Sequence, residues 1–366
     1  MLIDIIVAEY ADFIKVASLI HAILREQKKG YSIRFRFIYT GSHNDTYIMS
    51  GILSQLSLPK PNLNLELGAS MTESEQIATL LVRYEKVLTM GKPNLILTIS
   101  DSNASVACAI AAKKLYNTWM GHIDAGQQTD SLPGSNINRV LVDSITDFYF
   151  TPSHSANDNL RRMGVTDERI FFVGNTRIDT LMKLLKNAKP DSLWEQIGLK
   201  QGAYFVLLLH HSRNMKPLVL KDLLVNIVRS SQKLPVIMAV NPANAKMAAA
   251  AGIKSPNLHL INIPEYPQLV YLLANAAAVI TDHNYTQEDA TVLHIPCITI
   301  GDSKERPETY SVGTNILISE LDGLGPAFEK IMKKGWKKGN IPYLWDGEAA
   351  ERILAVIKNL DSEIVK

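Results

Sequence analysis

The sequence predicts an α/β protein made of two Rossmann-like domains, each a doubly wound parallel sheet, that face a common cleft. Three observations carry this prediction. Short apolar runs rich in branched residues alternate with longer stretches of helical periodicity. The alternation occurs in two series, and a polar segment with Pro and Gly separates them at about 183–203. A length of 366 residues suits two cores of ordinary size better than one.

The first series gives the first domain, which we place at 1–182. Its strands are expected at 2–8, 34–41, 94–101, 119–126 and 147–153. Its helices are expected at 13–29, from about Asp45 onward, and at 105–116, where alanine is abundant. Strand, helix and strand in this rhythm indicate parallel βαβ units with right-handed crossovers.

The second series follows the expected linker at 183–203 and gives a second domain at 204–346. Its strands are expected at 203–211, 234–240, 259–263, 276–282 and 297–301, with a helix over 220–232. A charged helix over 347–366 closes the chain, and its packing back on the first domain is left open. Ligands of such sheets bind at the carboxyl ends of the strands, where this chain has polar clusters.

Composition excludes several classes of function. Lys and Arg number 38 against 36 Asp and Glu, so the net charge of +2 leaves no basic surplus for nucleic acid. No uncharged apolar run reaches the ~18 residues of a membrane span, and no cationic leader precedes the first strand. Cys108 and Cys297 lie far apart in apolar runs and are expected as buried thiols. We therefore expect a cytoplasmic protein that contacts neither membrane nor nucleic acid.

Several cofactor motifs are missing from the sequence. The turn after the first strand reads AEYAD, so the GxGxxG of a dinucleotide site is absent there. The sequence also has no Walker loop, no CxxC and no HExxH. We expect no cofactor and no metal.

A set of short motifs at the expected strand ends runs in one order through nearly the whole chain: TGSH (40–43), HIDAG (122–126), NINR (136–139), GN followed by Asp179, QEDA (287–290), ERPE (305–308) and DGEAAERI (346–353). In order and spacing this set resembles the non-hydrolysing UDP-N-acetylglucosamine 2-epimerases, which have the glycosyltransferase-B fold.

The resemblance implies a UDP-sugar substrate in the inter-domain cleft, no metal or nicotinamide, and a homodimer. It also implies a reaction in two steps. A base removes the proton from C2 while UDP leaves C1, which gives a glycal; UDP then adds again with protonation of C2 on the other face. An acid, a base and stabilisation of charge are needed.

Three catalytic residues of the first domain follow from the resemblance. Asp101 matches an aspartate of acid–base type, although an Asp there also suits an N-cap of the next helix. Asp124 stands where the family has glutamate, and a solvated loop acid is its alternative. Arg139 matches an arginine that orders the acids, with an exposed surface Arg as the alternative. His122 is a candidate for orienting the loop or for a structural role.

His210 ends an apolar strand and is the fourth catalytic candidate, with His211 as its alternative. Tyr10 and Lys15 match positions near the diphosphate, and a lysine on the helix surface is the alternative for Lys15. His43 of TGSH lies in the neighbourhood that the family uses as an allosteric substrate site.

The substrate-binding residues of the second domain lie in two segments. The first runs from a strand end into a helix, whose N-terminus favours phosphate; its members are His283, Asn284, Tyr285, Glu288 and Asp289. Asp289 takes the position that holds the ribose hydroxyls in the family. The second segment, 305–308, contributes Arg306, which we expect to shape the nucleotide pocket. The alternative for Arg306 is an ion pair with Glu305 or Glu308.

The chain departs from the family pattern at several positions. Tyr10 replaces an arginine, Asp12 a glutamate, Ser135 a catalytic glutamate and Arg213 a further glutamate, while residues 283–285 replace Ser-Gly-Gly. Side chains there should hinder close approach of phosphate to the backbone. Three readings stay open: an active 2-epimerase with a re-shaped site, a catalytically impaired paralogue that binds a nucleotide sugar or a partner, and a glycosyltransferase of the same fold.

Overall fold

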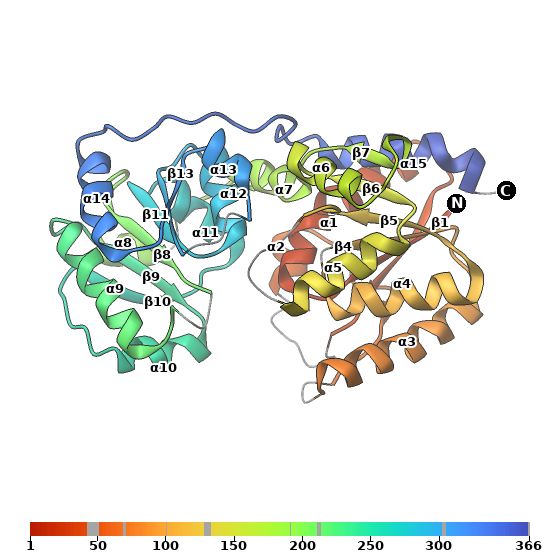
Figure 1. Ribbon diagram of the computed structural model, residues 1–366, viewed down its shortest axis with the longest axis horizontal. Coiled ribbons are helices and arrows are strands. Elements are labelled where there is room, and N and C mark those ends of the chain that lie inside the picture. The colour runs from red at the N-terminus through yellow and green to blue at the C-terminus, as the bar shows by residue number, and fades with distance from the viewer. Residues whose placement is uncertain are drawn as a thin grey trace. The chain divides into compact units, whose positions relative to one another are not determined.

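Two parallel β-sheets, each in its own unit of the chain, form the frame of the protein (Figure 1). The computed structural model describes residues 1–41, 51–68, 71–99, 101–127, 133–190, 192–210, 214–301 and 305–364. Unit 1 consists of Met1–Thr180 and Tyr343–Lys366, and unit 2 of Leu181–Pro342. The prediction of two parallel doubly wound sheets is confirmed.

The sheet of unit 1 has the strand order β3-β2-β1-β4-β5-β6-β7. Its strands are β1 (Leu2–Val7), β2 (Arg34–Tyr39), β3 (Leu63–Asn64), β4 (Leu95–Ile99), β5 (Trp119–Ile123), β6 (Phe148–Thr151) and β7 (Ile170–Phe172). Its helices are α1 (Tyr10–Lys28), α2 (Leu53–Gln55), α3 (Glu73–Met90), α4 (Asn103–Tyr116), α5 (Pro133–Ile145), α6 (His154–Arg162), α7 (Thr176–Leu185) and α15 (Ala349–Ile364), of which α7 continues into unit 2.

The strands at the centre of this sheet are buried on both faces. Every residue of β4 is buried, which is the pattern of a parallel strand covered by helices on two sides. A side chain at Gly121 on β5 would meet Leu97 and Phe150 at 2.8 Å, so the neighbouring side chains fill the space above this strand. The apolar runs of the sequence thus become the core of unit 1.

The end of the chain returns to unit 1, where α15 packs against α1 (Figure 1). Trp345 is fully buried and its indole N–H donates to the carbonyl of Pro152 at 2.8 Å. The carboxylate of Asp179 on α7 accepts the N–H groups of Ala349 and Ala350 at 3.1 and 2.7 Å. Asp179 therefore caps the N-terminus of α15 from another helix, which satisfies groups that a helix cannot pair itself.

The sheet of unit 2 has the strand order β10-β9-β8-β11-β12-β13. Its strands are β8 (Phe205–Leu208), β9 (Val236–Val240), β10 (Leu258–Asn262), β11 (Ala278–Thr281), β12 (Cys297–Ile300) and β13 (Asn315–Ile318). Its helices are α8 (Ser192–Ile197), α9 (Pro217–Ser230), α10 (Pro242–Ala250), α11 (Tyr266–Ala274), α12 (Asn284–Val292), α13 (Pro307–Ser311) and α14 (Leu324–Met332).

Residues 183–203 belong to unit 2 and do not form a separate linker. The division between the units falls inside α7, and α8 follows it. Trp194 on α8 packs edge-on against Tyr204 and Tyr271, with ring centroids 5.3 and 5.1 Å apart. This aromatic contact fixes a segment whose polar composition indicated a linker.

The helix expected from about Asp45 begins outside the described residues, which resume at 51. Among the helices that the structure does describe, none has the length and apolar character that crossing a membrane requires.

Candidate functional site

The order of the strands in unit 1 reverses between β1 and β4. After β1 the chain moves outward to β2 and β3, then crosses back so that β4 pairs with β1 on its other side. Ligands of doubly wound sheets bind at the carboxyl ends of the strands at this switch point. Here those ends are Val7 and Ile99, and the candidate residues of the first domain follow them.

Asp101 and Arg139 form an ion pair, with 3.0 Å between a guanidinium nitrogen and a carboxylate oxygen. A second nitrogen of Arg139 donates to the carbonyl of Gln127 at 2.8 Å, and the amide of Asn138 donates to the carbonyl of Asp101 at 3.0 Å. Asp101 is not the N-cap of α4, because Ser102 has that position and accepts the N–H of Ser105. Helix α5 therefore holds Asp101 in place.

Lys15 and Asp124 form a buried ion pair at 2.5 Å. Lys15 lies on α1 with its side chain 2% exposed, so the reading of a surface lysine is wrong. Asp124 follows β5 with a backbone φ of 64°, a left-handed conformation that suits an Asp at a turn, and it is not a solvated loop acid. A contact of Lys15 with a diphosphate stays a prediction.

A buried pair of His122 and Asp143 supports the loop that carries Asp124. The Nδ1 atom of His122 lies 2.6 Å from one oxygen of Asp143, and the other oxygen accepts the N–H of Gly126 at 3.1 Å. Gly126 has a φ of 73°, and a Cβ there would lie 2.4 Å from the carbonyl oxygen of Ala156. Asp143 was not singled out from the sequence; its place one helical turn after Arg139 is the only signal.

Glu9 is a second residue that sequence reasoning missed. It lies two residues after the end of β1 and is the N-cap residue of α1, with part of its surface exposed. Exclusion of water by surrounding protein, with the negative charges of Asp12 and Asp101, raises the pKa of Glu9 to about 7, while Lys15 opposes this. Asp12 itself is buried and accepts the N–H groups of Ala8 and Glu9 at 3.0 and 3.1 Å.

Unit 2 has its own switch point between β8 and β11. Asp282, which follows β11, accepts the backbone N–H of His210 at 2.7 Å and the side-chain amide of Asn214 at 2.8 Å. The ring of His210 stacks on that of His283, with centroids 4.0 Å apart, and Tyr285 meets His283 edge-on at 4.9 Å. Three of the predicted residues, His210, His283 and Tyr285, thus form one aromatic group at this edge.

The segments 282–289 and 305–308 also contact each other. Arg306 and Glu288 form an ion pair at 2.5 Å with both side chains buried, and Asn284 donates to Glu305. Arg306 therefore pairs with Glu288, a partner that the sequence-based alternative of Glu305 or Glu308 did not include. Burial alone would lower the pKa of Arg306, but the charges of Glu288 and Glu308 raise it.

Asp289 and Tyr10 complete the predicted set within the described residues. Asp289 is buried on α12, and the hydroxyl of Tyr266 lies 3.4 Å from both of its carboxylate oxygens. Tyr10 is the first residue of α1 and is half-buried. His43 and His211 lie outside the described residues, as does the side chain of Ser135.

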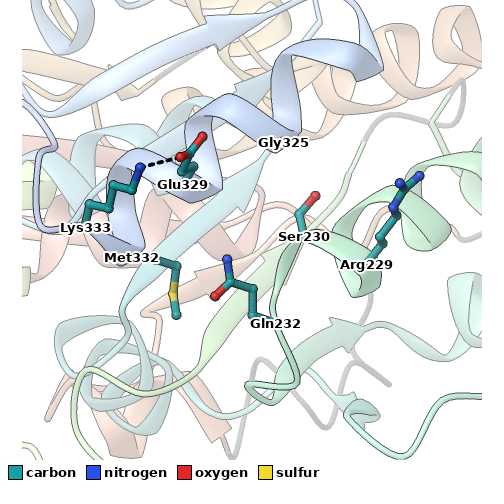
Figure 2. A pocket seen from close by; sticks show the side chains of 7 residues that line it. All are labelled: Arg229, Ser230, Gln232, Gly325, Glu329, Met332 and Lys333. Carbon is teal, nitrogen blue, oxygen red and sulfur yellow. Dashed lines mark hydrogen bonds and ion pairs between the residues drawn. The ribbon is translucent and has the colours of Figure 1, made fainter.

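A hollow of about 540 Å³ lies at a different edge of unit 2. Figure 2 shows it among Arg229 and Ser230 at the end of α9, Gln232 in the following turn, and Lys333, which pairs with Glu329 of α14. This is where the chain enters β9, at the amino edge of the sheet. The hollow is therefore separate from the strand ends that carry the candidate residues. Among the described residues no cluster of three His, Cys, Asp or Glu side chains suits a metal ion.

Comparisons with known proteins agree over nearly the whole chain. The family model described as UDP-N-acetylglucosamine 2-epimerase matches residues 25–358. A UDP-N-acetylglucosamine 2-epimerase of Methanococcus maripaludis is 33% identical, covering 97% of this chain and 98% of the relative. The protein of that name from Methanocaldococcus jannaschii is 30% identical, covering 98% and 99%. A crystal structure of the M. jannaschii 2-epimerase in complex with UDP-GlcNAc and UDP matches with a TM-score of 0.81 at 30% identity, over 98% of this chain and 100% of that chain.

Proposed function

Because the chain belongs to the UDP-N-acetylglucosamine 2-epimerase family, we propose that it interconverts UDP-N-acetylglucosamine and UDP-N-acetylmannosamine. The observation that carries this proposal is the likeness over 98% of the chain to a 2-epimerase whose crystal structure contains UDP-GlcNAc and UDP. The whole-length relatives reported above are named 2-epimerases, which favours neither a glycosyltransferase nor a binding paralogue.

Unit 1 supplies the groups that handle protons at C2. Removing that proton as UDP leaves C1 requires a base, and the return step requires an acid. The carboxylates of Asp101 and Asp124 stand at one sheet edge, and Arg139 and Lys15 hold them in place. Lys15 and Arg139 also place positive charge where negative charge develops on the departing diphosphate.

Unit 2 holds the nucleotide. Helix α12 begins beside His283, and the N–H groups of a helix N-terminus attract phosphate. Asp282 fixes the backbone of His210, which directs the imidazole to the same strand end. The buried pair of Arg306 and Glu288 joins the 305–308 turn to α12 and so maintains the shape of this nucleotide site.

Incubation with UDP-N-acetylglucosamine, followed by proton NMR of the anomeric region, tests this function. We expect the anomeric signal of UDP-N-acetylmannosamine to grow to a constant ratio, and deuterium to enter C2 when the solvent is D₂O. The variant Asp101→Asn serves as the control for a contaminating activity. Absence of both a new anomer and C2 exchange in the wild type would favour the reading of a catalytically impaired paralogue.

We also propose a homodimer in the cytoplasm. The homodimer is the assembly that the resemblance to the family implies, and light scattering of the purified protein measures it. The cytoplasm suits the two cysteines, both of which are buried free thiols.

A further inference from the structure

Inversion at C2 needs two different proton-handling groups. If one group removed the proton and returned it to the same face, the starting sugar would form again. An enzyme of this type therefore needs a carboxylate that accepts the proton and a carboxylic acid that donates one to the opposite face. Two acids with unequal surroundings can divide these roles.

The carboxylates of unit 1 differ in their counter-charges. Asp101 lies 3.0 Å from Arg139 and Asp124 lies 2.5 Å from Lys15, so each has a cation in direct contact. Among the residues that the structure describes, no cation lies within ion-pair distance of Glu9. The charges of Asp12 and Asp101 repel a negative charge on Glu9, and the smaller effect of Lys15 favours it.

Glu9 also stands level with Asp101 at the switch point. Strands β1 and β4 pair with Ile5 opposite Leu97, and Glu9 and Asp101 each lie four residues beyond that pair. The two residues therefore leave adjacent strands at the same height. Asp12 is buried, whereas Glu9 keeps part of its surface open although the surrounding protein excludes much of the water from its carboxyl group.

We propose that Glu9 is the proton donor of this site and acts on C2 together with Asp101 as the base. This inference rests on the proposed 2-epimerase function and adds a residue to it.

In the elimination step, the Asp101 carboxylate takes the C2 proton, the C2–H electrons form the C1=C2 bond, and the C1–O bond breaks to release UDP. In the return step, the glycal takes the proton of the Glu9 carboxylic acid at C2, while a β-phosphate oxygen of UDP bonds to C1. Glu9 ends as a carboxylate and Asp101 as an acid, and exchange of protons with water restores both. No oxidant or cofactor is needed.

The acidity of Glu9 suits a donor. With a pKa of about 7, a large share of Glu9 molecules holds a proton at neutral pH, whereas an ordinary exposed glutamate does not. General acids work best when their pKa lies near the working pH. The donor activity should therefore decline as the pH rises above about 7.

The variant Glu9→Gln separates the two steps, since it removes the acid and leaves Asp101 untouched. We expect formation of the UDP-N-acetylmannosamine anomer to fall at least ~100-fold, the scale of lost general acid catalysis. Release of UDP and of the glycal should persist, so free UDP should accumulate. Phosphorus NMR measures the UDP, and proton NMR measures the glycal. Glu9→Asp keeps a carboxyl group and should recover part of the epimer formation. A disturbance of the fold would lower elimination and epimer formation together.

Glu73→Gln is the matched control, because Glu73 is an exposed carboxylate in the first turn of α3 and Glu9 is the N-cap of α1. Both changes replace a carboxyl group at a helix N-terminus by an amide. Glu73→Gln should leave the rates and the pH profile unchanged, while Glu9→Gln should abolish the decline above pH 7. If Glu9→Gln forms the epimer at a rate within threefold of the wild type, the proposed role of Glu9 is overturned and the proposed 2-epimerase function is not. A wild type without any turnover would overturn the proposed function, and this inference with it.

Discussion

The ammonium nitrogen of Lys15 lies 2.5 Å from a carboxylate oxygen of Asp124, and both side chains are almost fully buried. The pair joins α1 to the loop after β5, two segments separated by more than a hundred residues of sequence. Each charge compensates the cost of removing the other from water. Removal of one partner is therefore more damaging than removal of both.

We expect Lys15→Met to lower the free energy of unfolding of the protein by about 3–5 kcal/mol, since it leaves the Asp124 charge buried without a partner. The double variant Lys15→Met/Asp124→Leu should recover much of this loss and yet remain inactive. Urea denaturation measures the stability, and the NMR assay measures activity. Lys28→Met, on the exposed side of the same helix, is the control. An equal loss in the single and double variants would show that the pair is not coupled.

The second prediction concerns Asp101 and His210, which end strands at the two switch points. We expect Asp101→Asn and His210→Ala each to lower epimerisation at least ~100-fold, because the first removes the proposed base and the second the imidazole that the resemblance to the family implies in catalysis. Asp222→Asn and His259→Ala, which lie on α9 and β10, are the matched controls. Rates near that of the wild type in both variants would move the search for the base to Asp124 and His211.

The fully buried strands of this fold could be predicted from the sequence, whereas three partly buried strands could not. Runs such as 205–208 and 278–281 are apolar throughout because helices cover both faces of a parallel sheet. Strands β3, β7 and β13 were missed, since β3 has two residues and β7 has three half-buried ones. Two or three residues are too few to show a periodic pattern. Such a strand forms because it pairs with a neighbouring strand of the sheet.

The positions of most candidate residues of unit 1 could be predicted because they follow strand ends, and parallel strands bring their carboxyl ends to one edge of the sheet. Which charges pair could not be predicted in this way. Lys15 and Asp124 meet only when α1 lies against the loop after β5, and Asp143 reaches His122 only through the position of α5. Glu9 was missed because, within the AEYAD turn, the family pattern has a carboxylate at the position of Asp12 and none at that of Glu9.

Asp179 gives a prediction about stability. Its carboxylate accepts the N–H groups of Ala349 and Ala350, so Asp179→Ala leaves the N-terminus of α15 without its cap. We expect the free energy of unfolding to fall by about 0.5–2 kcal/mol, the usual cost of a lost cap. Thermal and urea denaturation measure the change. Asp222→Ala, at an exposed position within α9, should change stability much less; equal effects in both variants would contradict the capping role.

The last prediction concerns Tyr10, the first residue of α1, where the family pattern has an arginine. A guanidinium offers the diphosphate a charge-assisted hydrogen bond worth about 1.5–3 kcal/mol, and a tyrosine offers one neutral hydroxyl. We therefore expect this protein to bind UDP about ten- to a hundredfold more weakly than an arginine-bearing relative, and Tyr10→Arg to recover that difference. Calorimetry with UDP measures both, with Tyr10→Phe as the control for loss of the hydroxyl alone. Submicromolar affinity of the wild type, unchanged in Tyr10→Arg, would mean that other groups already meet the diphosphate charge.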